Sequence, residues 1–555
     1  MFVFCGYLLV KSRIMNQQFV LIDYLIFGLY AVVILFVGLF MSRTKKGEVK
    51  TTEDYFLAGK TLPWWAIGAS LIAANISAEQ FIGMSGSGFA VGLAIASYEW
   101  MAALTLIIVG KYFLPVFLKQ GIYTIPEFVE KRFNTSLKTI LAVFWISLFV
   151  FVNLTSVIYL GGKALDTILS VGDGSDIVLY MLGLALFAAA YSVWGGLSAV
   201  AWTDVIQVVL LIAGGLITTF IALNHVTVTG GILHGLEHIY DVAGDKFHMI
   251  ISRDNPEFSN LPGIAVLIGG MWVANLYYWG FNQYIIQRAL AAKSQKEAQN
   301  GIAFAAFLKI IVPLIVVIPG IIAAVMYKEN IAGAIDSFAN NGSINYDKAY
   351  PWLISTFVPA GLKGLVVAAL SAAIVSSLAS MLNSTSTIFT MDIYKPYFNK
   401  NAGNKRLVTV GRVTVLVALI IATSIAKTMG SIPQMFQYIQ EYTGIVSPGI
   451  LAVFLMGLFW KKTNVKGAIV GVLTSIPIAL ALKFLPVDMP FLDQMLYTLL
   501  MTMVVIVGVS LNTGEGDDDS KSIPLLKETF VTGKTFNISA YIILIILVVL
   551  YTVFW

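Results

Sequence analysis

The stretch SLIAANISAEQF, residues 70–81, lies inside a long apolar run and yet carries Asn75, Ser77, Glu79 and Gln80. Ionisable and amide side chains are unfavourable at the centre of a bilayer unless a partner pairs with them or water reaches them. We therefore expect these polar side chains to have a binding partner within the membrane.

The composition indicates a chain folded in lipid. Hydrophobic residues make up 58% of the 555 residues, charged residues 12%, and the mean hydropathy is +0.84, which excludes an ordinary soluble domain. A lone cysteine, Cys5, leaves no internal disulfide and no cysteine-based metal site. The net charge of +5 is small, and the basic residues stand in short loops between apolar runs, so nucleic acid is not an expected partner.

Apolar runs of membrane-spanning length predict about fourteen transmembrane helices in an all-α integral membrane protein. The predicted spans lie near residues 20–42, 63–89, 92–118, 139–167, 177–194, 199–224, 261–283, 302–327, 360–388, 407–426, 433–460, 464–482, 491–511 and 538–555. If the N-terminus is outside, most of the 35 Lys and Arg fall in loops on the inner side, so we expect both termini outside. The expected location is a cell membrane, the bacterial inner membrane, with multiple passes. Residues 1–14 lack the basic start of a signal peptide, and we expect a dispensable extension.

Two histidines, His234 and His238, share one helical face in a loop after the sixth span, a spacing that could hold zinc. The sequence shows no nearby third ligand of matching geometry, so we favour an amphipathic helix at the membrane interface. The sequence contains no HExxH, G-x-S-x-G or Walker motif, and we do not expect an enzyme.

Polar groups recur within seven of the predicted spans. Any one of them could be a hydrogen bond between helices. Their number instead favours a hydrated, substrate-sized cavity at mid-membrane depth. The groups are Asn75, Gln80, Tyr98, Glu99, Asp204, Asn275, Lys309, Ser376, Ser377, Gln440 and Glu441.

The order of the spans suggests two halves of five helices, and the odd number places the second half upside down relative to the first. The first helix of each half carries Asn and other polar groups, in AANISAEQ and VANLYYWG, and is expected to be broken. The predicted organisation is an extension at 1–19, a peripheral span and inner loop at 20–62, the first repeat at 63–224, an outer loop at 225–260, the second repeat at 261–460, and three peripheral spans at 461–555.

Four runs carry a resemblance to a known family: YFLAGKTLPWWAIGASLIAANISAEQFIGMSGSGFAVGLAIASYEW, GGLSAVAWTDVIQV, WVANLYYWGFNQYIIQR and AAIVSSLASMLNSTSTIFTMDIY. They closely resemble the sodium/solute symporter family, and within it the bacterial sodium/galactose symporters and their glucose-transporting relatives. The resemblance implies a LeuT-type fold of fourteen helices, with a five-plus-five inverted repeat, that works by alternating access.

The resemblance also implies a sodium site. Its ligands would be the backbone carbonyls of Ala73, Ile76 and Ala373 and the hydroxyls of Ser376 and Ser377, and such neutral oxygens suit a hard monovalent cation. Asp204 would lie on the inward path of the ion. Sodium is then the coupling ion, and no cofactor is expected.

The sugar contacts implied by the family fall on five spans, where amide, carboxylate and ammonium groups can satisfy sugar hydroxyls. They are Gln80, Glu99, Asn275, Lys309 and Gln440, with Tyr278 as the inner gate and Met84, Tyr98 and Phe436 closing the other side. Ala102 replaces a serine that contacts the sugar in galactose transporters of this type, so the preferred hexose stays open.

A sodium-coupled importer of a hexose, galactose or glucose, is the function that these observations favour. A symporter of the same fold for an amino acid or vitamin is an alternative, but Glu99 favours a polyol over a carboxylate-bearing solute. A channel or a membrane sensor is a second alternative, although the thick apolar runs favour a gated site. The sequence does not indicate an oligomeric state.

Overall fold

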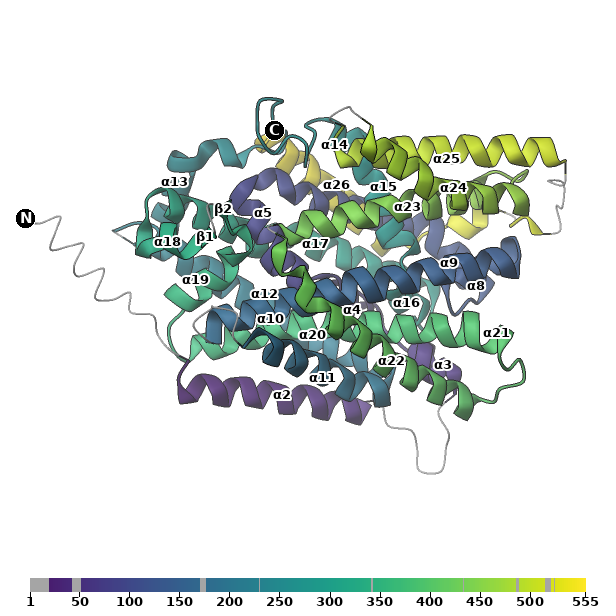
Figure 1. Ribbon diagram of the computed structural model, residues 1–555, viewed down its shortest axis with the longest axis horizontal. Helices are drawn as coiled ribbons and strands as arrows, with labels where there is room; N and C mark the ends of the chain where they lie inside the picture. Colours follow the sequence, from purple (N-terminus) through teal and green to yellow (C-terminus); the bar gives the residue numbers. More distant parts are fainter. Residues whose placement is uncertain are drawn as a thin grey trace, which may run out of the picture.

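The computed structural model describes residues 19–41, 51–169, 176–228, 230–340, 343–432, 434–485, 489–514, 521–523 and 525–555. Residues 1–14, which we expect to be dispensable, lie outside this part of the chain. The helices run side by side along the long axis of the molecule (Figure 1). At one end lie α13, Ile232–Ala243, and α18, Ala334–Phe338. At the other lie α8, Ile125–Arg132, and α21, Lys395–Tyr397.

Eleven helical stretches in the described residues are long and apolar enough to cross a membrane, and each overlaps a predicted span. Hydrophobic composition over 20 residues or more suffices to predict them. They are α2 Leu21–Met41, α6 to α7 Leu93–Gln120, α9 to α10 Thr135–Leu169, α12 Leu197–His225, α17 Gln295–Lys328, α20 to α21 Leu362–Tyr397, α22 with its last turn Asn404–Gly430, α23 Met435–Phe459, α24 Val465–Phe484, α25 Phe491–Thr513 and α26 Lys534–Val553.

The other three predicted spans differ from a single long apolar helix. One is α11, Ile177–Gly195, whose apolar stretch is shorter. The second consists of α4 Trp64–Asn75, the π-helical turn η2 Glu79–Met84 and α5 Ser85–Ala90. The third consists of α14 Ala265–Ile268, α15 Gly270–Leu276, the π-helical turn η7 Tyr277–Phe281 and α16 Gln283–Leu290.

Both expected breaks are present. The backbone of Ile76 is extended, with φ −76° and ψ 106°, so α4 ends there. The second interrupted span is broken twice: at Gly269, with φ −116° and ψ −133°, and at Asn282, with φ −82° and ψ 121°, on either side of the polar residue Asn275. Ile76 and Asn282 are neither glycine nor proline, and the polar side chains near them are the sequence signal that marks these two spans.

Short elements complete the chain. The helix α3, Thr52–Leu57, precedes the first broken span. Between α17 and α20 lie α18, the antiparallel strands β1 Ala339–Asn340 and β2 Ser343–Ile344, the 3-10 turn η9 Tyr346–Lys348, and α19 Ala349–Phe357. The helix α13 is the amphipathic helix expected around His234 and His238. His238 Nε2 lies 3.0 Å from Glu329 Oε2.

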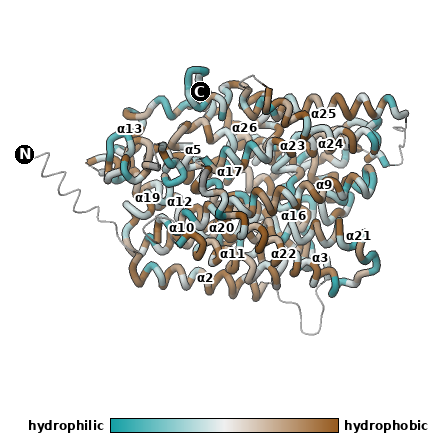
Figure 2. Tube along the Cα trace, viewed as in Figure 1, coloured by the Kyte–Doolittle hydropathy of each residue, from teal (hydrophilic) through white to brown (hydrophobic). Residues whose placement is uncertain are grey.

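The helix α20 lies at the centre of the molecule and α2 at its edge. In the most apolar window of α20 with α21, 94% of residues are buried, against 17% for α2 and for α26. Hydrophobic residues predominate along α2 and α25, whereas hydrophilic ones gather near α13 and α21 at the two ends (Figure 2). This distribution fits a bilayer around the middle of the molecule.

Candidate functional site

A narrow cavity lies between the two broken spans and the helices α6, α17 and α23. Its volume is about 50 Å³, room for a few water molecules rather than a whole hexose. All nine predicted sugar and gate residues line it: Gln80, Met84, Tyr98, Glu99, Asn275, Tyr278, Lys309, Phe436 and Gln440. Ala102 and Thr443 line it as well.

A buried ion pair crosses this cavity. The Lys309 ammonium on α17 donates hydrogen bonds to Glu99 Oε2 on α6 and to Asn75 Oδ1 at the end of α4. The exposed fractions of the Lys309 and Glu99 side chains are only 1% and 3%. The ammonium also lies 5.1 Å from the centre of the Trp279 ring. Because charges buried this deeply must be paired, Lys309 and Glu99 hold each other in place and present polar atoms to the cavity.

Tyr278, the predicted inner gate, is connected to the same network. Asn75 Nδ2 donates to the Tyr278 hydroxyl at 2.9 Å, and the Tyr284 hydroxyl donates to it at 2.7 Å. The first broken span is thereby joined to the second. On another side of the cavity the rings of Tyr98 and Phe436 meet edge to face, with centroids 5.2 Å apart.

Gln80 is held by its own segment. Its Oε1 accepts the backbone N–H of Ser77 at 3.0 Å and so caps the start of the helical turn that follows the break in α4. Asn275 donates its Nδ2 to the carbonyl of Met271 at 3.1 Å, while Gln440 is half-buried at the cavity wall. Gln80 thus lines the cavity and also holds the backbone at the break, so a movement of its side chain in the cavity changes the break directly.

The residues of the predicted sodium site lie near this break. Ala73, Ile76, Ala373, Ser376 and Ser377 are all fully buried. The last turn of a helix leaves backbone carbonyls without partners inside the helix. At the end of α4 the Ile76 N–H donates to the carbonyl of Ile72, so the carbonyls that follow need partners from elsewhere. The Ser377 hydroxyl on α20 donates to the carbonyl of Ala74, at the last turn of α4, at 3.0 Å. Ala74 thus stands beside the predicted ligands, although the prediction did not include it.

Asp204 lies next to the serine pair rather than apart from it. The Ser376 hydroxyl donates to Asp204 Oδ1 at 2.5 Å, and the Ser70 hydroxyl donates to Asp204 Oδ2 at 2.5 Å. Arg288 Nη2 is 3.7 Å from Asp204 Oδ2. Arg288 also donates to Ser380 and to the carbonyl of Tyr284. One buried cluster thus joins α4, α12, α16 and α20.

Asn75 is one of the polar groups that predict the cavity, but neither Asn75 nor Arg288 is among the expected sugar and sodium contacts. Asn75 stands in the stretch that drew attention first, and its mid-span amide was the available signal. Arg288 stands near the end of a span, where a basic residue usually orients the chain in the membrane. Its side chain is fully buried, which the sequence does not reveal.

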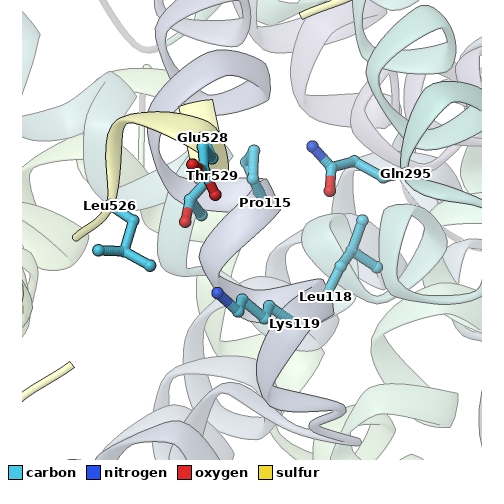
Figure 3. Close-up of a pocket in the computed structure, with 7 residues that line it drawn as sticks. All are labelled: Pro115, Leu118, Lys119, Gln295, Leu526, Glu528 and Thr529. Carbon is cyan, nitrogen blue, oxygen red and sulfur yellow. The ribbon is translucent and has the colours of Figure 1, made fainter. Parts of the chain in front are cut away.

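A larger cavity, about 420 Å³, lies elsewhere, between the end of α7, Leu114–Gln120, and the segment before α26 (Figure 3). Its lining includes Lys119, Gln295 and Glu528, of which Lys119 and Glu528 are exposed to solvent. It contains none of the groups on the broken spans. The smaller cavity is therefore the candidate site.

A helical membrane protein with two interrupted spans and a polar cavity between them has the architecture of a secondary transporter. The sequence pattern of the sodium:solute symporter family matches residues 55–475, and the chain belongs to this family.

Two relatives and one solved structure show how similar the chain is to known proteins. The chain is 65% identical to the sodium/glucose cotransporter of Vibrio parahaemolyticus over 538 residues, which is 96% of this chain and 98% of that protein. It is 35% identical to human sodium/myo-inositol cotransporter 2, over 82% of this chain and 69% of that one. It also resembles a Na+-coupled sialic acid symporter in a substrate-bound, outward-open state, with a TM-score of 0.76, 25% identity, and coverage of 89% of this chain and 98% of that one.

Proposed function

We propose that the protein is a sodium-coupled symporter that imports a hexose by alternating access. The observation that carries the proposal is the single segment 73–80. It holds the end of α4 against Ser377 on one side, and on the other it presents Asn75 and Gln80 to the cavity. An ion and a sugar bound on the two sides of this segment would act on the same backbone break, which is the requirement for coupling.

The chemistry of the cavity suits a cyclic polyol. Hydroxyl groups both donate and accept hydrogen bonds, and the wall offers amide, carboxylate and ammonium groups beside the aromatic faces of Trp279 and Tyr278. The similarity to a glucose cotransporter and to an inositol cotransporter supports the same class of solute. An amino acid or vitamin as solute, or a channel or sensor, is less consistent with these relatives.

The finer architecture belongs to the same proposal. The eleven long spans together with α11 and the two interrupted spans make fourteen crossings in a LeuT-type inverted repeat, with both termini outside. Sodium is bound by the carbonyls of Ala73, Ile76 and Ala373 and the hydroxyls of Ser376 and Ser377. The Ala74 carbonyl and Asp204 lie close enough to take part, because each already bonds one of these serines.

Uptake into proteoliposomes tests the function. Labelled glucose, galactose, myo-inositol and an amino acid are offered with an inward sodium gradient, and with potassium in place of sodium as the control. We expect a hexose to accumulate above its outside concentration only under the sodium gradient. Accumulation of the amino acid alone, or equal uptake in both salts, would contradict the proposal.

A further inference from the structure

The chain between α17 and α20 contains a carboxylate that is unusual for a loop. We define the lid as residues 334–340 and 343–348, which include α18, the paired strands β1 and β2, and η9. Asp347, at the end of the lid, is only 1% exposed, whereas Asp336 in the same lid is exposed. A buried carboxylate is destabilising unless it is paired or hydrogen-bonded, so its partners indicate what it does.

Asp347 joins the lid to two membrane helices. Its Oδ2 accepts the backbone N–H of Met435, the first residue of α23, at 3.4 Å. The same oxygen lies 4.0 Å from Lys163 Nζ on α10, Thr155–Leu169. Lys163 also donates to Asn345 Oδ1 in the lid at 3.2 Å. A carboxylate at the N-terminus of α23 is further favoured by the helix dipole.

The lid rests tightly on α5, the second half of the first broken span. A Cβ on Gly86 would lie 2.9 Å from the carbonyl of Tyr346 and 3.0 Å from Asp347 Oδ1. The ring of Phe89 contacts those of Tyr346 and Phe338, with centroids 5.4 Å and 5.2 Å away. The lid and α5 therefore cannot move closer, and they separate only if these contacts break.

The Asp347 contact reaches the wall of the substrate cavity. Met435 is followed by Phe436, which lines the cavity and packs on Tyr98. A Cβ on Gly83, in η2, would lie 2.9 Å from Phe436 Cβ. The start of α23 is thus fixed between Asp347 on the lid side and η2 on the cavity side.

We propose that Asp347 is a positioning residue that holds the lid closed over the substrate cavity by joining it to Lys163 and to the first turn of α23. The proposal rests on the alternating access of the proposed function. In the conformation whose cavity is open toward the lid, α23 and α5 must move apart from each other. The contacts of Asp347 are among those that must then break.

The groups around Asp347 set the pH range in which its contact with Lys163 is an ion pair. Burial raises the pKa of Asp347 to about 6, opposed by the Lys163 ammonium and the Met435 N–H. The ionisable groups that face it are Lys163 and Tyr159 on α10; from α5 and α23 it is met by the glycine Gly86 and the backbone of Met435. Asp347 is therefore ionised above about pH 6, and the variants are compared at about pH 7.5, where its contact with Lys163 is charged.

A cysteine reporter measures the closure. Cys5→Ser removes the natural thiol, and Met84→Cys places a new one at the cavity wall. A membrane-impermeant thiol reagent is added on the lid side, without sugar or sodium. We expect Asp347→Asn to label at least about five-fold faster than the parent because it loses the charged contact. Lys163→Gln should act in the same direction, and Asp336→Asn is the matched control.

Two outcomes decide the proposal. A double variant, Asp347→Asn with Lys163→Gln, should label no faster than the faster single variant, since both remove one interaction. Equal rates for Asp347→Asn and Asp336→Asn would overturn it.

Two measurements keep the test independent of the folding of one variant and of the proposed sugar function. If Asp347→Asn does not yield folded protein, Lys163→Gln alone carries the test, and labelling at the parent rate overturns the proposal. Labelling needs no solute, and sugar uptake is measured separately on the same proteoliposomes. A failure of the proposed sugar function therefore appears in uptake and leaves the labelling result intact.

Discussion

Ser377 is the residue at which the ion site can be tested with the least disturbance. Its hydroxyl bonds the carbonyl of Ala74, so Ser377→Ala removes one oxygen beside the proposed sodium and leaves a buried methyl group. We expect half-maximal sugar binding to need roughly ten-fold more sodium, with binding restored at high sodium.

The control is Ser371→Ala on the same helix. Ser371 is 2% exposed, and its hydroxyl has no hydrogen-bond partner among the described residues. Sugar affinity is measured across a wide sodium range in the parent and both variants. Superimposable curves for Ser377→Ala and the parent would place the ion elsewhere.

Glu99 tests the sugar site through its charge. Glu99→Gln keeps the shape of the side chain but leaves the Lys309 ammonium buried without a counter-charge, which is unfavourable. We expect sugar affinity to fall on the order of ten- to a hundred-fold. Glu441→Gln is the control, since Glu441 pairs with Lys483 at 2.8 Å where both side chains are partly exposed. Equal affinities for the two variants, measured by titration calorimetry, would remove Glu99 from the site.

Ala102 tests which hexose the cavity prefers. It lines the cavity and is 1% exposed, so Ala102→Ser adds one hydroxyl to an apolar part of the wall. A new hydrogen bond contributes about 0.5–1.5 kcal/mol, and we expect galactose binding to tighten up to about ten-fold relative to glucose. Competition between the two sugars for uptake measures the change. A large loss of galactose affinity would show that the wall at Ala102 cannot accommodate a hydroxyl.

At this scale the polarity of side chains marks the cavity wall in the sequence more clearly than it marks the ion site, which stays a prediction. Polar side chains in lipid-embedded helices are few, so those that line the cavity stood out, Gln80 and Lys309 among them. Backbone carbonyls carry no such signal, because every residue has one, and the contact of Ala74 with Ser377 depends on how two helices cross. Arg288 looked like a loop residue because burial of its side chain depends on Asp204, 84 positions earlier in the chain.

At the scale of elements, small residues determine how closely α5 approaches α17. A Cβ on Gly320 would lie 2.0 Å from the carbonyl of Ser85, and one on Gly88 would lie 2.7 Å from that of Val317. We expect Gly320→Ala to lower the thermal midpoint of the purified protein by several degrees or to prevent its folding, because backbone cannot move aside as a side chain can. Gly508→Ala, where nothing lies within 4 Å of the added atom, should leave the midpoint unchanged. Equal midpoints for both variants would contradict this packing.

The long helices followed from hydrophobicity alone, but the position of each break did not. Hydropathy identifies which stretch of chain crosses lipid. It carries no information about the groups that replace the internal hydrogen bonds of a helix where the helix is interrupted. At Ile76 those groups come from Gln80 and from Ser377 on a distant helix. At Asn282 the turn separates η7 from α16, beyond the polar residues that had marked the span.

For the whole molecule, the shared segment 73–80 predicts thermodynamic coupling. Sodium that orders the break should raise the affinity for sugar, and sugar should raise the affinity for sodium by the same factor. We expect a factor of roughly five to a hundred, typical of coupled sites. Binding of a hexose measured in sodium and in choline gives the factor directly. Identical affinities in the two salts would mean that the ion and the sugar do not act on a common conformation.

The π-helical turns at Glu79–Met84 and Tyr277–Phe281 affect how this chain is compared with others. A π turn closes its hydrogen bond one residue further along than an α turn. A relative with a plain α-helix at either place would match this chain only through a one-residue gap within the span. If the gap were ignored, every later side chain of that span would be matched to one about 100° away around the helix. Roles transferred by alignment past these turns therefore depend on where the gap is placed, and Asn282 and Arg288, which follow the second turn, are the positions most affected.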